Sequence, residues 1–241
     1  MGSFYYDLHT HSCLSPCGSN DATPASIAGF GVLNGLDILA LTDHNTCANC
    51  PAFFKAAREY GLTPVAGMEL TTAEDIHAVC LFETLEGALD FDREVEKRRM
   101  PVKNREEIFG EQLIMNENDE IIGRKENLLI TAADISLEEA PALAAQYGGL
   151  CYPAHIDREA NGVIAVLGDF PPEPFFSCAE LRDKENAAHY RAAYPVLQNK
   201  TLVFSSDAHR LADINGKENC LALEGESERE IIQSLFERLR R

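Results

Sequence analysis

Short apolar runs alternate along the chain with longer segments in which apolar residues recur at helical spacing. Runs of this length predict strands, and the segments between them predict amphipathic helices. The predicted strands are Phe4–Leu8, Asp37–Leu41, Thr63–Ala66, His77–Phe82, Leu150–Pro153, Ala179–Leu181, Leu202–Ser205 and Cys220–Leu223. The predicted helices are Thr23–Asn34, Pro51–Tyr60, Ser136–Gln146, Glu185–Ala193 and Glu228–Arg240. The residues Ser136–Glu139 match a capping box at the start of the third helix.

This alternation of strands and helices predicts an α/β fold with a parallel sheet and right-handed crossovers. About eight strands in a chain of this length are enough to close a barrel, and an open doubly wound sheet is the alternative. The charged stretch at 87–125 has few β-branched runs, and we interpret it as an insertion within a single domain that covers residues 1–241. Its segment Gly110–Gly123 predicts a hairpin or a lid.

The chain carries 39 acidic against 21 basic residues, and its net charge of −18 narrows the range of partners. Such a field repels nucleic-acid phosphates and anionic membranes. We therefore expect a small phosphorylated substrate, and neither duplex nucleic acid nor a membrane as partner. The substrate phosphate then needs bound cations that reverse the field locally. The pattern does not indicate an oligomeric state.

The N-terminus lacks the positively charged start and apolar core of a secretory signal, and no apolar stretch is long enough to span a membrane. We expect a cytoplasmic protein, in which thiols stay reduced. The eight cysteines are therefore interpreted mainly as small buried apolar residues. Cys47 and Cys50 have a CxxC spacing that could bind zinc or support redox chemistry, but the lack of a second CxxC favours packing.

His9 and His11 directly follow the first predicted strand. Residues i and i+2 of an extended segment point to the same side, so the two imidazoles could share a metal ion. Two ordinary surface or core histidines explain this pair equally well. The other histidines change the balance, because six of the seven lie at predicted strand ends and only His189 falls in a predicted helix.

Acidic residues accompany these histidines at the strand ends. Asp43 precedes His44, Glu69 follows a strand, and Asp207 lies two residues before His209. In barrels and open α/β sheets, the carboxyl ends of the strands form the reactive face. Imidazole with carboxylate is the ligand set of Zn²⁺, Mn²⁺ and Fe²⁺ sites. If two or more ions bind, we expect a bridging carboxylate and a bridging hydroxide.

Two further histidines lie at strand ends in opposite senses. His155 follows the strand that ends at Pro153, as the pattern requires. His77 instead opens its strand, so it reaches the others only if that strand runs antiparallel or begins near the rim.

A series of motifs resembles the polymerase and histidinol phosphatase (PHP) family of metal-dependent phosphoesterases. The motifs are DLHTHS, LTDHNT, GMELTT, the later His77, PAHIDR and SSDAHR, and they extend from residue 4 to about residue 210. The resemblance implies a distorted seven-stranded (β/α) barrel, and it favours seven strands over eight. It also implies two or three divalent ions (Zn, Mn or Fe) and a phosphate ester as substrate.

The resemblance assigns the ligands by position, with Glu69 as the bridge between two ions. The ligands that it implies for the first ion are His9, His11, Glu69 and Asp207. Those that it implies for the second ion are Glu69, His77 and His155. Those that it implies for a third ion are His44 and His209.

The third site departs from the family's pattern. The family usually supplies another Asp or His shortly after the His-x-His strand, often within Ser-Asp-Gly. This chain has Ser15-Pro16-Cys17-Gly18 there, so the Cys17 thiolate and Asp21 are the candidate ligands. Asp43 is predicted to orient an imidazole without binding metal, with a turn or capping role as the alternative.

Two arginines follow histidines at the predicted rim. Arg158 lies three residues after His155, and Arg210 directly follows His209. Arginine matches phosphate oxygens bidentately, and the resemblance implies phosphate binding at Arg158. For Arg210, a solvated surface charge is the favoured interpretation.

The expected chemistry is hydrolysis by metal-held hydroxide. The chain contains neither GxSxG nor a P-loop, so a covalent mechanism has little support. We expect a hydroxide between the ions to attack phosphorus, with Asp207, His209 and Arg158 as the catalytic residues. The segment near Glu111–Gly123 would close over the substrate and exclude water.

Two other functions fit parts of this pattern. An amidohydrolase-type metal enzyme also uses His-x-His on a barrel and would cleave a C–N or carboxylic ester bond. It often uses a strand-borne lysine, however, and no lysine here ends a predicted barrel strand. A non-catalytic module would bind metal or a nucleotide without turnover, but the complete ligand set favours an enzyme.

Overall fold

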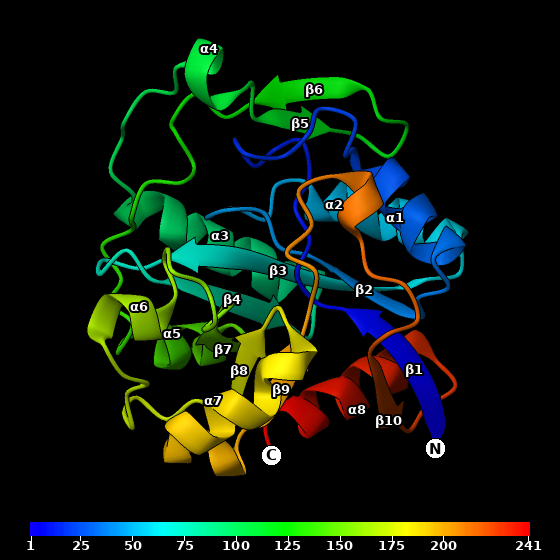
Figure 1. Ribbon diagram of the computed structural model, residues 1–241. Coiled ribbons are helices and arrows are strands. Elements are labelled where there is room, and N and C mark those ends of the chain that lie inside the picture. Colours follow the sequence, from blue (N-terminus) through cyan, green and yellow to red (C-terminus); the bar gives the residue numbers. More distant parts are fainter.

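A curled sheet of six strands is the frame of the molecule in the computed structural model, which describes residues 1–241 (Figure 1). Its order is β10–β1–β2–β3–β4–β7. The bounds are β1 Gly2–Asp7, β2 Ile38–Leu41, β3 Thr63–Thr71, β4 His77–Phe82, β7 Gly149–Pro153 and β10 Cys220–Leu223. β1, β2 and β3 run parallel, whereas β10 is antiparallel to β1 and β4 is antiparallel to both of its neighbours. Within this sheet, the expectation of parallel strands is therefore correct only for β1, β2 and β3.

A second, parallel pair of strands consists of β8 (Cys178–Leu181) and β9 (Thr201–Phe204). The chain after β7 contacts β8, because the Ile156 N–H donates to the Glu180 carbonyl at 2.9 Å. The chain after β9 contacts the chain after β1 through a parallel bridge between Ala208 and Thr10. Hydrogen bonds thus divide the strands into a sheet of six and a pair, and the predicted count of seven barrel strands is not confirmed. The fold is a mixed α/β half-barrel.

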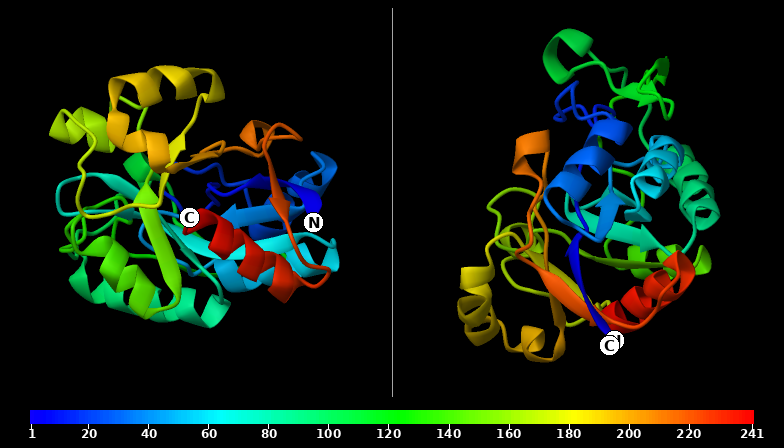
Figure 2. Two further views of the ribbon diagram at one scale, coloured as in Figure 1. Left: turned by 90° about the horizontal axis from the view of Figure 1, so that it is seen from below. Right: turned by 90° about the vertical axis from the view of Figure 1, so that its right-hand side faces the viewer.

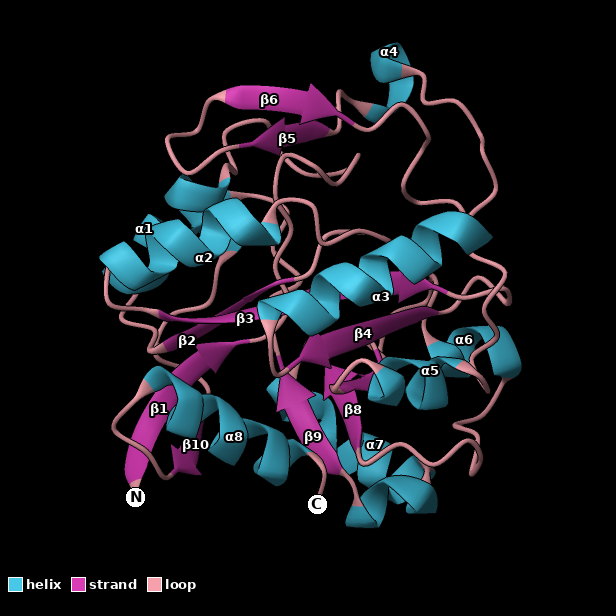
Figure 3. Cartoon of the chain, turned by 180° about the vertical axis from the view of Figure 1, so that it is seen from behind, coloured by secondary structure: helices cyan, strands magenta, loops and turns pink.

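Successive residues of the central strands face two different apolar layers. Leu39 and Leu41 of β2 pack in one layer with α1 (Pro24–Leu33) and α2 (Cys50–Glu59), whereas Ile38 pairs with α8 (Glu228–Leu239) in the other. Side chains of a strand alternate between its faces, so a strand covered on both sides must be apolar throughout. Figure 2, seen from below, shows α8 beneath the sheet, and Figure 3 shows α3 lying across β3 and β4 on the opposite side.

All five predicted helices are present, with small shifts at their ends. The remaining helices are α3 Leu85–Arg98, α4 Glu106–Phe109, α5 Ala140–Gln146, α6 Val163–Leu167 and α7 Ala187–Ala193, with 3-10 turns η1 Lys184–Asn186, η2 Pro195–Asn199 and η3 Leu211–Asp213. The predicted capping box is only half formed: the Ser136 hydroxyl accepts from the Glu139 N–H, but α5 begins at Ala140, four residues after the predicted start. The complete box, at Ser227 and Glu230, opens α8. No helix is long and apolar enough to cross a membrane.

The stretch at 87–125 contains most of α3, the short helix α4 and a hairpin. Its first part belongs to α3, a helix that the sequence pattern does not predict, and Phe91 of this helix is buried against the sheet. Its last part is a hairpin, as one interpretation of this segment predicted. The hairpin strands are β5 Leu113–Met115 and β6 Ile121–Arg124. The hairpin stands on the loop after β1, where Leu113 and Met115 pack against Cys13.

Candidate metal centre

The predicted ligands meet at the edge of the sheet where β1, β2 and β3 end. They are His9 and His11 after β1, His44 after β2, Glu69 within β3, His77 at the start of β4, His155 after β7, and Asp207 and His209 after β9. β4 runs antiparallel to β3, and His77 pairs with Thr71 at the end of that strand. This direction brings His77 to the same edge as the other ligands, as its position in the sequence required.

One group of four side chains lies around the ring nitrogens of the His-x-His pair. The Nε2 atoms of His9 and His11 are 3.1 Å apart. From the Nε2 of His11, both Glu69 Oε2 and Asp207 Oδ1 lie at 3.3 Å. From the Nε2 of His9, the same two oxygens lie at 3.4 and 3.6 Å. All four side chains are buried, and their ligand atoms are close enough to hold one ion.

The carboxylate of Glu69 is shared with a second set of imidazoles. Its Oε1 lies 2.8 Å from His77 Nδ1 and 2.9 Å from His155 Nε2. Its Oε2 lies 3.0 Å from His44 Nδ1. Glu69 therefore stands at the centre of the cluster, where a bridging carboxylate has to stand.

A third group consists of imidazoles alone. Ring nitrogens of His11, His44 and His209 lie within 4.8 Å of one another. The rings of His11 and His209 are stacked, with centroids 4.2 Å apart. The structure thus adds His11 to the two histidines expected here.

Several of the converging atoms lack any hydrogen-bond partner, which tests whether metal ions fit. His44 Nδ1, Glu69 Oε2, His77 Nδ1 and Asp207 Oδ1 are all buried, and although oppositely charged groups lie 2.8–3.3 Å from them, none of these atoms makes a well-aligned hydrogen bond. Buried polar atoms in proteins are nearly always paired, so four such atoms that face one another indicate a missing partner. A divalent cation accepts lone pairs from this donor set and fits between them.

Two of the ligands also have unusual backbone conformations. His155 has a φ of 27° and Asp207 a φ of 54°, in the left-handed region that L-residues rarely adopt. Such strain persists only where the surroundings hold it, and it clusters at functional sites.

The ionisable side chains of the centre differ widely in their pKa values. Burial alone would lower the pKa of His11, but the adjacent carboxylates of Asp207 and Glu69 raise it to about 9. Burial lowers the pKa of His44 to about 4 and that of His209 to about 3. Burial opposes ionisation of Glu69, yet the surrounding imidazoles hold its pKa well below the usual range. The carboxylate at the centre is thus ionised and surrounded by positive or neutral nitrogens.

Asp43 does not touch an imidazole directly. Its Oδ1 accepts from the Ser15 hydroxyl at 2.7 Å, and the Ser15 oxygen lies 3.0 Å from His11 Nδ1. Its two oxygens also accept from the N–H and hydroxyl of Ser12. Asp43 therefore orients the ring of His11 indirectly, through the Ser15 hydroxyl, and not by a direct hydrogen bond.

The two candidates for the extra ligand lie outside these groups. Cys17 and Asp21 are both exposed, and neither belongs to a set of converging ligand atoms. Partial desolvation and the charges of Glu69 and Asp207 raise the pKa of the Cys17 thiol to about 12. Without a nearby cation, this group is a thiol and not a thiolate.

Sequence reasoning missed Glu180, which lies within β8 and is completely buried. Its Oε1 lies 2.9 Å from His9 Nδ1 and accepts from the His155 N–H at 3.1 Å. A signal was available, because Glu180 is the one charged residue in the apolar run Cys178–Leu181.

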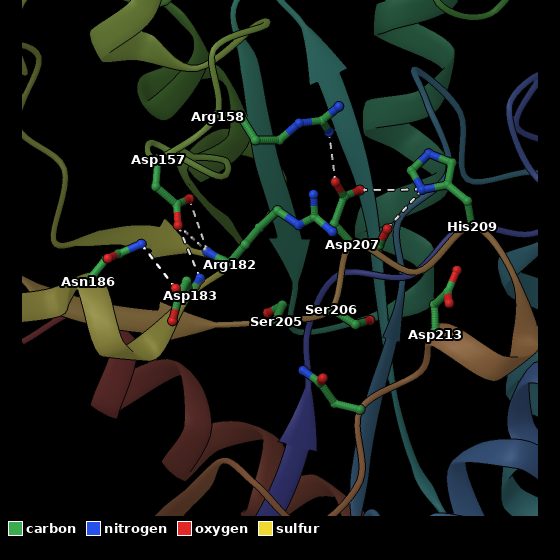
Figure 4. A pocket seen from close by; sticks show the side chains of 11 residues that line it. Asp157, Arg158, Arg182, Asp183, Asn186, Ser205, Ser206, Asp207, His209 and Asp213 are labelled. Carbon is green, nitrogen blue, oxygen red and sulfur yellow. Dashed lines mark hydrogen bonds and ion pairs between the residues drawn. The ribbon is translucent and has the colours of Figure 1, made fainter.

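A polar cavity of 770 Å³ opens beside Asp207 (Figure 4). No apolar residue lines it, and its wall includes His209, Ser206 and two arginines. Arg158 donates to Asp207 Oδ2 at 2.8 Å and is 37% exposed. Arg182, which the sequence pattern did not single out, extends toward Asp207 in Figure 4. Arg210 is exposed and does not line the cavity, as its surface-charge interpretation predicted.

The family model described as PHP domain matches residues 7–146 of this chain. A segment of 89 residues is 33% identical to an error-prone DNA polymerase of Symbiobacterium thermophilum, over 37% of this chain and 8% of that protein. Another of 79 residues is 34% identical to a 5′-3′ exoribonuclease of Haemophilus influenzae, over 32% of this chain and 28% of that protein. The chain thus matches less than a third of the length of either relative.

Solved structures match over nearly the whole chain. Endonuclease Q of Pyrococcus furiosus has a TM-score of 0.66 and 18% identity, over 99% of this chain and 56% of that one. A Bifidobacterium adolescentis protein described as a metal-dependent phosphoesterase has a TM-score of 0.55 and 19% identity, over 95% and 96%. An amidohydrolase of Chromobacterium violaceum has a TM-score of 0.57 and 17% identity, over 91% and 92%. At these identities the likeness concerns the fold.

The exclusion of duplex nucleic acid on the ground of net charge is wrong. Endonuclease Q, which shares this fold with a TM-score of 0.65 in its complex, was solved with a 27-mer duplex bearing an abasic lesion. Net charge sums the whole surface, whereas a phosphate responds to the cations and arginines that it contacts. The restriction to small substrates falls with this exclusion.

Proposed function

Because the chain belongs to the PHP domain family, we propose that it is a metal-dependent phosphoesterase that hydrolyses phosphate monoesters or diesters. The observation that carries the proposal is the buried carboxylate of Glu69 among unpartnered imidazole nitrogens, beside a polar cavity that exposes Arg158. The first feature suits cations. The cavity has two arginines beside four aspartates, so it suits an anion once cations are bound, and hydrolysis of a phosphate ester requires both.

We assign two or three divalent ions, Zn, Mn or Fe, to the three groups of side chains. The ligands assigned to the first ion are His9, His11, Glu69 and Asp207. Those assigned to the second are Glu69, His77 and His155. Those assigned to the third are His44 and His209 together with His11, whose ring nitrogen lies within reach of the same ion, whereas the sequence candidates Cys17 and Asp21 lie outside this group. Donor type supports the assignment, since imidazole and carboxylate suit these metals.

When bound, the ions lower the pKa of water toward about 7 and neutralise charge on the phosphoryl oxygens. The side chains orient the substrate. Arg158 uses one nitrogen for Asp207 and lies at the cavity wall, so its other N–H groups are free to donate to a phosphate oxygen. His209 lies on the same wall, and we propose that it and Arg158 stabilise the leaving oxygen.

The substrate class follows from the cavity and from the relatives. Without apolar lining, the cavity suits phosphate and hydroxyl groups better than a stacked base. The relatives named above include a DNA polymerase, an exoribonuclease and a DNA endonuclease. We therefore include phosphate esters of nucleic acids, single-stranded or duplex, among the proposed substrates.

Cleavage of a C–N or carboxylic ester bond is the alternative, and the likeness to an amidohydrolase keeps it in the test. The absence of lysine from the three ligand groups and from the cavity weighs against it. Lys200, the buried lysine, donates to the Phe176 carbonyl and has no part in the cluster. A module that binds metal or nucleotide without turnover is the other alternative.

The test is product release by protein loaded with Mn²⁺ or Zn²⁺, across mononucleotides, cyclic nucleotides, oligonucleotides and lesion-containing duplexes, with amide substrates as a separate arm. Asp207→Asn should lose turnover while keeping the fold, because it removes the charge that faces His9 and His11. Asp90→Asn, at a surface ion pair with Arg93 on α3, is the matched control. Full activity of the Asp207 variant, or amide hydrolysis alone, would overturn the proposal.

A further inference from the structure

A single carboxylate oxygen connects ligands of two different proposed metal positions. Glu180 Oε1 meets His9 Nδ1 at 2.9 Å and accepts from the His155 N–H at 3.1 Å. His9 belongs to the group around the His-x-His pair, whereas His155 meets the other oxygen of Glu69. Glu180 is completely buried and comes from β8, outside the six-stranded sheet.

We propose that Glu180 is a positioning residue that couples the first and second metal positions by holding the ring of His9 and the backbone of His155 on one oxygen. The inference rests on the proposed metal-dependent function. Because Glu180 touches neither the cavity nor the face of His9 that points to Glu69, it acts only through these two ligands.

The contact with His9 determines which ring nitrogen is available. A carboxylate oxygen accepts, so the Nδ1 that faces Glu180 carries the proton. The lone pair is then on Nε2, which faces His11 and Glu69. A carboxylate behind a ligating imidazole also raises the basicity of that ligand, and removal of such a partner typically weakens metal binding about 10- to 100-fold.

The contact with His155 supports a strained backbone. His155 has a φ of 27°, and its N–H would be buried without a partner if Glu180 were absent. A strained conformation persists where hydrogen bonds over-determine it. The same oxygen that fixes the tautomer of His9 therefore also fixes the direction in which His155 approaches Glu69.

The burial of Glu180 would be unfavourable without this role. Its second oxygen, Oε2, is buried and has no hydrogen-bond partner, and the nearby Tyr152 hydroxyl has none either. A buried carboxylate with an unpaired oxygen destabilises a fold. An apolar residue of similar volume would fit the run Cys178–Leu181 better, so packing does not explain a glutamate at this position.

The test compares Zn²⁺ and Mn²⁺ affinity, measured by competition with a chromophoric chelator, in three variants and a control. Glu180→Leu removes both contacts and should weaken both the first and the second binding step by about 100-fold. Glu180→Gln keeps an acceptor of the same reach and should restore most of the affinity. Tyr152→Phe alters only the neighbouring hydroxyl and should bind metal like the wild type.

A packing role would give the opposite order, because leucine packs at least as well as glutamine. Equal metal affinity of the wild type and Glu180→Leu, or weakening of one step only, would overturn the inference. If Glu180→Leu does not fold, Glu180→Asp decides: its shorter side chain cannot reach both N–H groups, so unchanged affinity would overturn it. Absence of metal binding by the wild type would instead refute the proposed function.

Discussion

The molecule buries two collections of side chains whose types can bind metal, and only one of them has the geometry of a metal site. The histidines and carboxylates at the strand ends point their ligand atoms at one another, at distances of 2.8–3.6 Å. Several of these atoms make no hydrogen bond. Four cysteines, Cys47, Cys50, Cys80 and Cys151, lie in the largest apolar cluster. Their thiols do not converge in any group of three ligand atoms.

The two collections differ in how their polar atoms are satisfied. The Cys47 thiol donates to the Gly67 carbonyl at 3.2 Å, and burial raises its pKa well above the usual range. Such a thiol behaves as a small apolar residue with a weak hydrogen bond. The difference teaches that neither ligand type nor burial marks a metal site here. What marks the metal site is the convergence of ligand atoms that make no hydrogen bond.

Removal of metal should have the largest effect. A chelator should abolish turnover, because nothing else in the centre replaces the cations between Glu69 and the imidazoles. It should also lower the melting temperature by about 5–10 °C if the ions were present at about 100 times their dissociation constants. Thermal unfolding with and without chelator measures this, and restoration by Mn²⁺ is the control.

The opposite result would remove the difference between the two collections of side chains. A chelated protein with unchanged melting temperature would mean that the unpartnered atoms of the centre do not bind metal. The two collections of side chains would then be equivalent, and the cluster at the strand ends would be a buried polar network only.

The next effect concerns the anion side of the centre. Arg158→Ala should lower kcat/KM by about 10- to 100-fold, because it removes a hydrogen bond to a charged oxygen worth about 1.5–3 kcal/mol. Arg210→Ala is the matched control, since Arg210 also follows a histidine but is exposed and outside the cavity. Steady-state kinetics of the two variants would contradict the assignment if they lost activity equally.

A smaller effect is expected from the support of His11. Ser15→Ala removes the hydroxyl between Asp43 and His11 Nδ1 and should weaken by about tenfold the metal-binding steps that use His11. The variant should leave the step that depends on His77 and His155 unchanged. Calorimetric titration resolves the steps, and equal weakening of all of them would mean that Ser15 supports the loop and not a particular ligand.

The sequence predicted five of the helices and the convergence at the strand ends because both depend on local patterns. The two histidines of a His-x-His that follows a strand point to the same side. The side chain of Thr23 caps the first turn of α1, which is the start that the sequence predicts. The direction of β4 was left open, because an apolar run reads the same in both directions. Only the pairing of His77 with Thr71 in the folded sheet decides it.

The features that the sequence did not predict depend on distant contacts. Glu180 meets His9 across 171 positions, so its place in an apolar run marks it as unusual, but nothing near it in the chain identifies its partner. The many charges of α3 favour its assignment to an insertion. The buried apolar stripe that contains Phe91 is the signal for a helix that this assignment overlooks. The whole-chain charge led to the wrong exclusion of duplex nucleic acid, because a phosphate responds to the local field that it meets and not to the net charge.

The smallest effect on the site, and the sharpest test of the comparison, comes from the thiols. The double variant Cys47→Ser, Cys50→Ser should keep the metal content and turnover of the wild type, because these side chains contribute no converging ligand atom. It should lose about 1–3 kcal/mol of unfolding free energy, since two hydroxyls replace thiols in an apolar layer. Metal analysis and urea unfolding measure the two quantities separately. Loss of an ion without loss of stability would show that the CxxC binds metal, and that convergence in the folded chain is not the criterion.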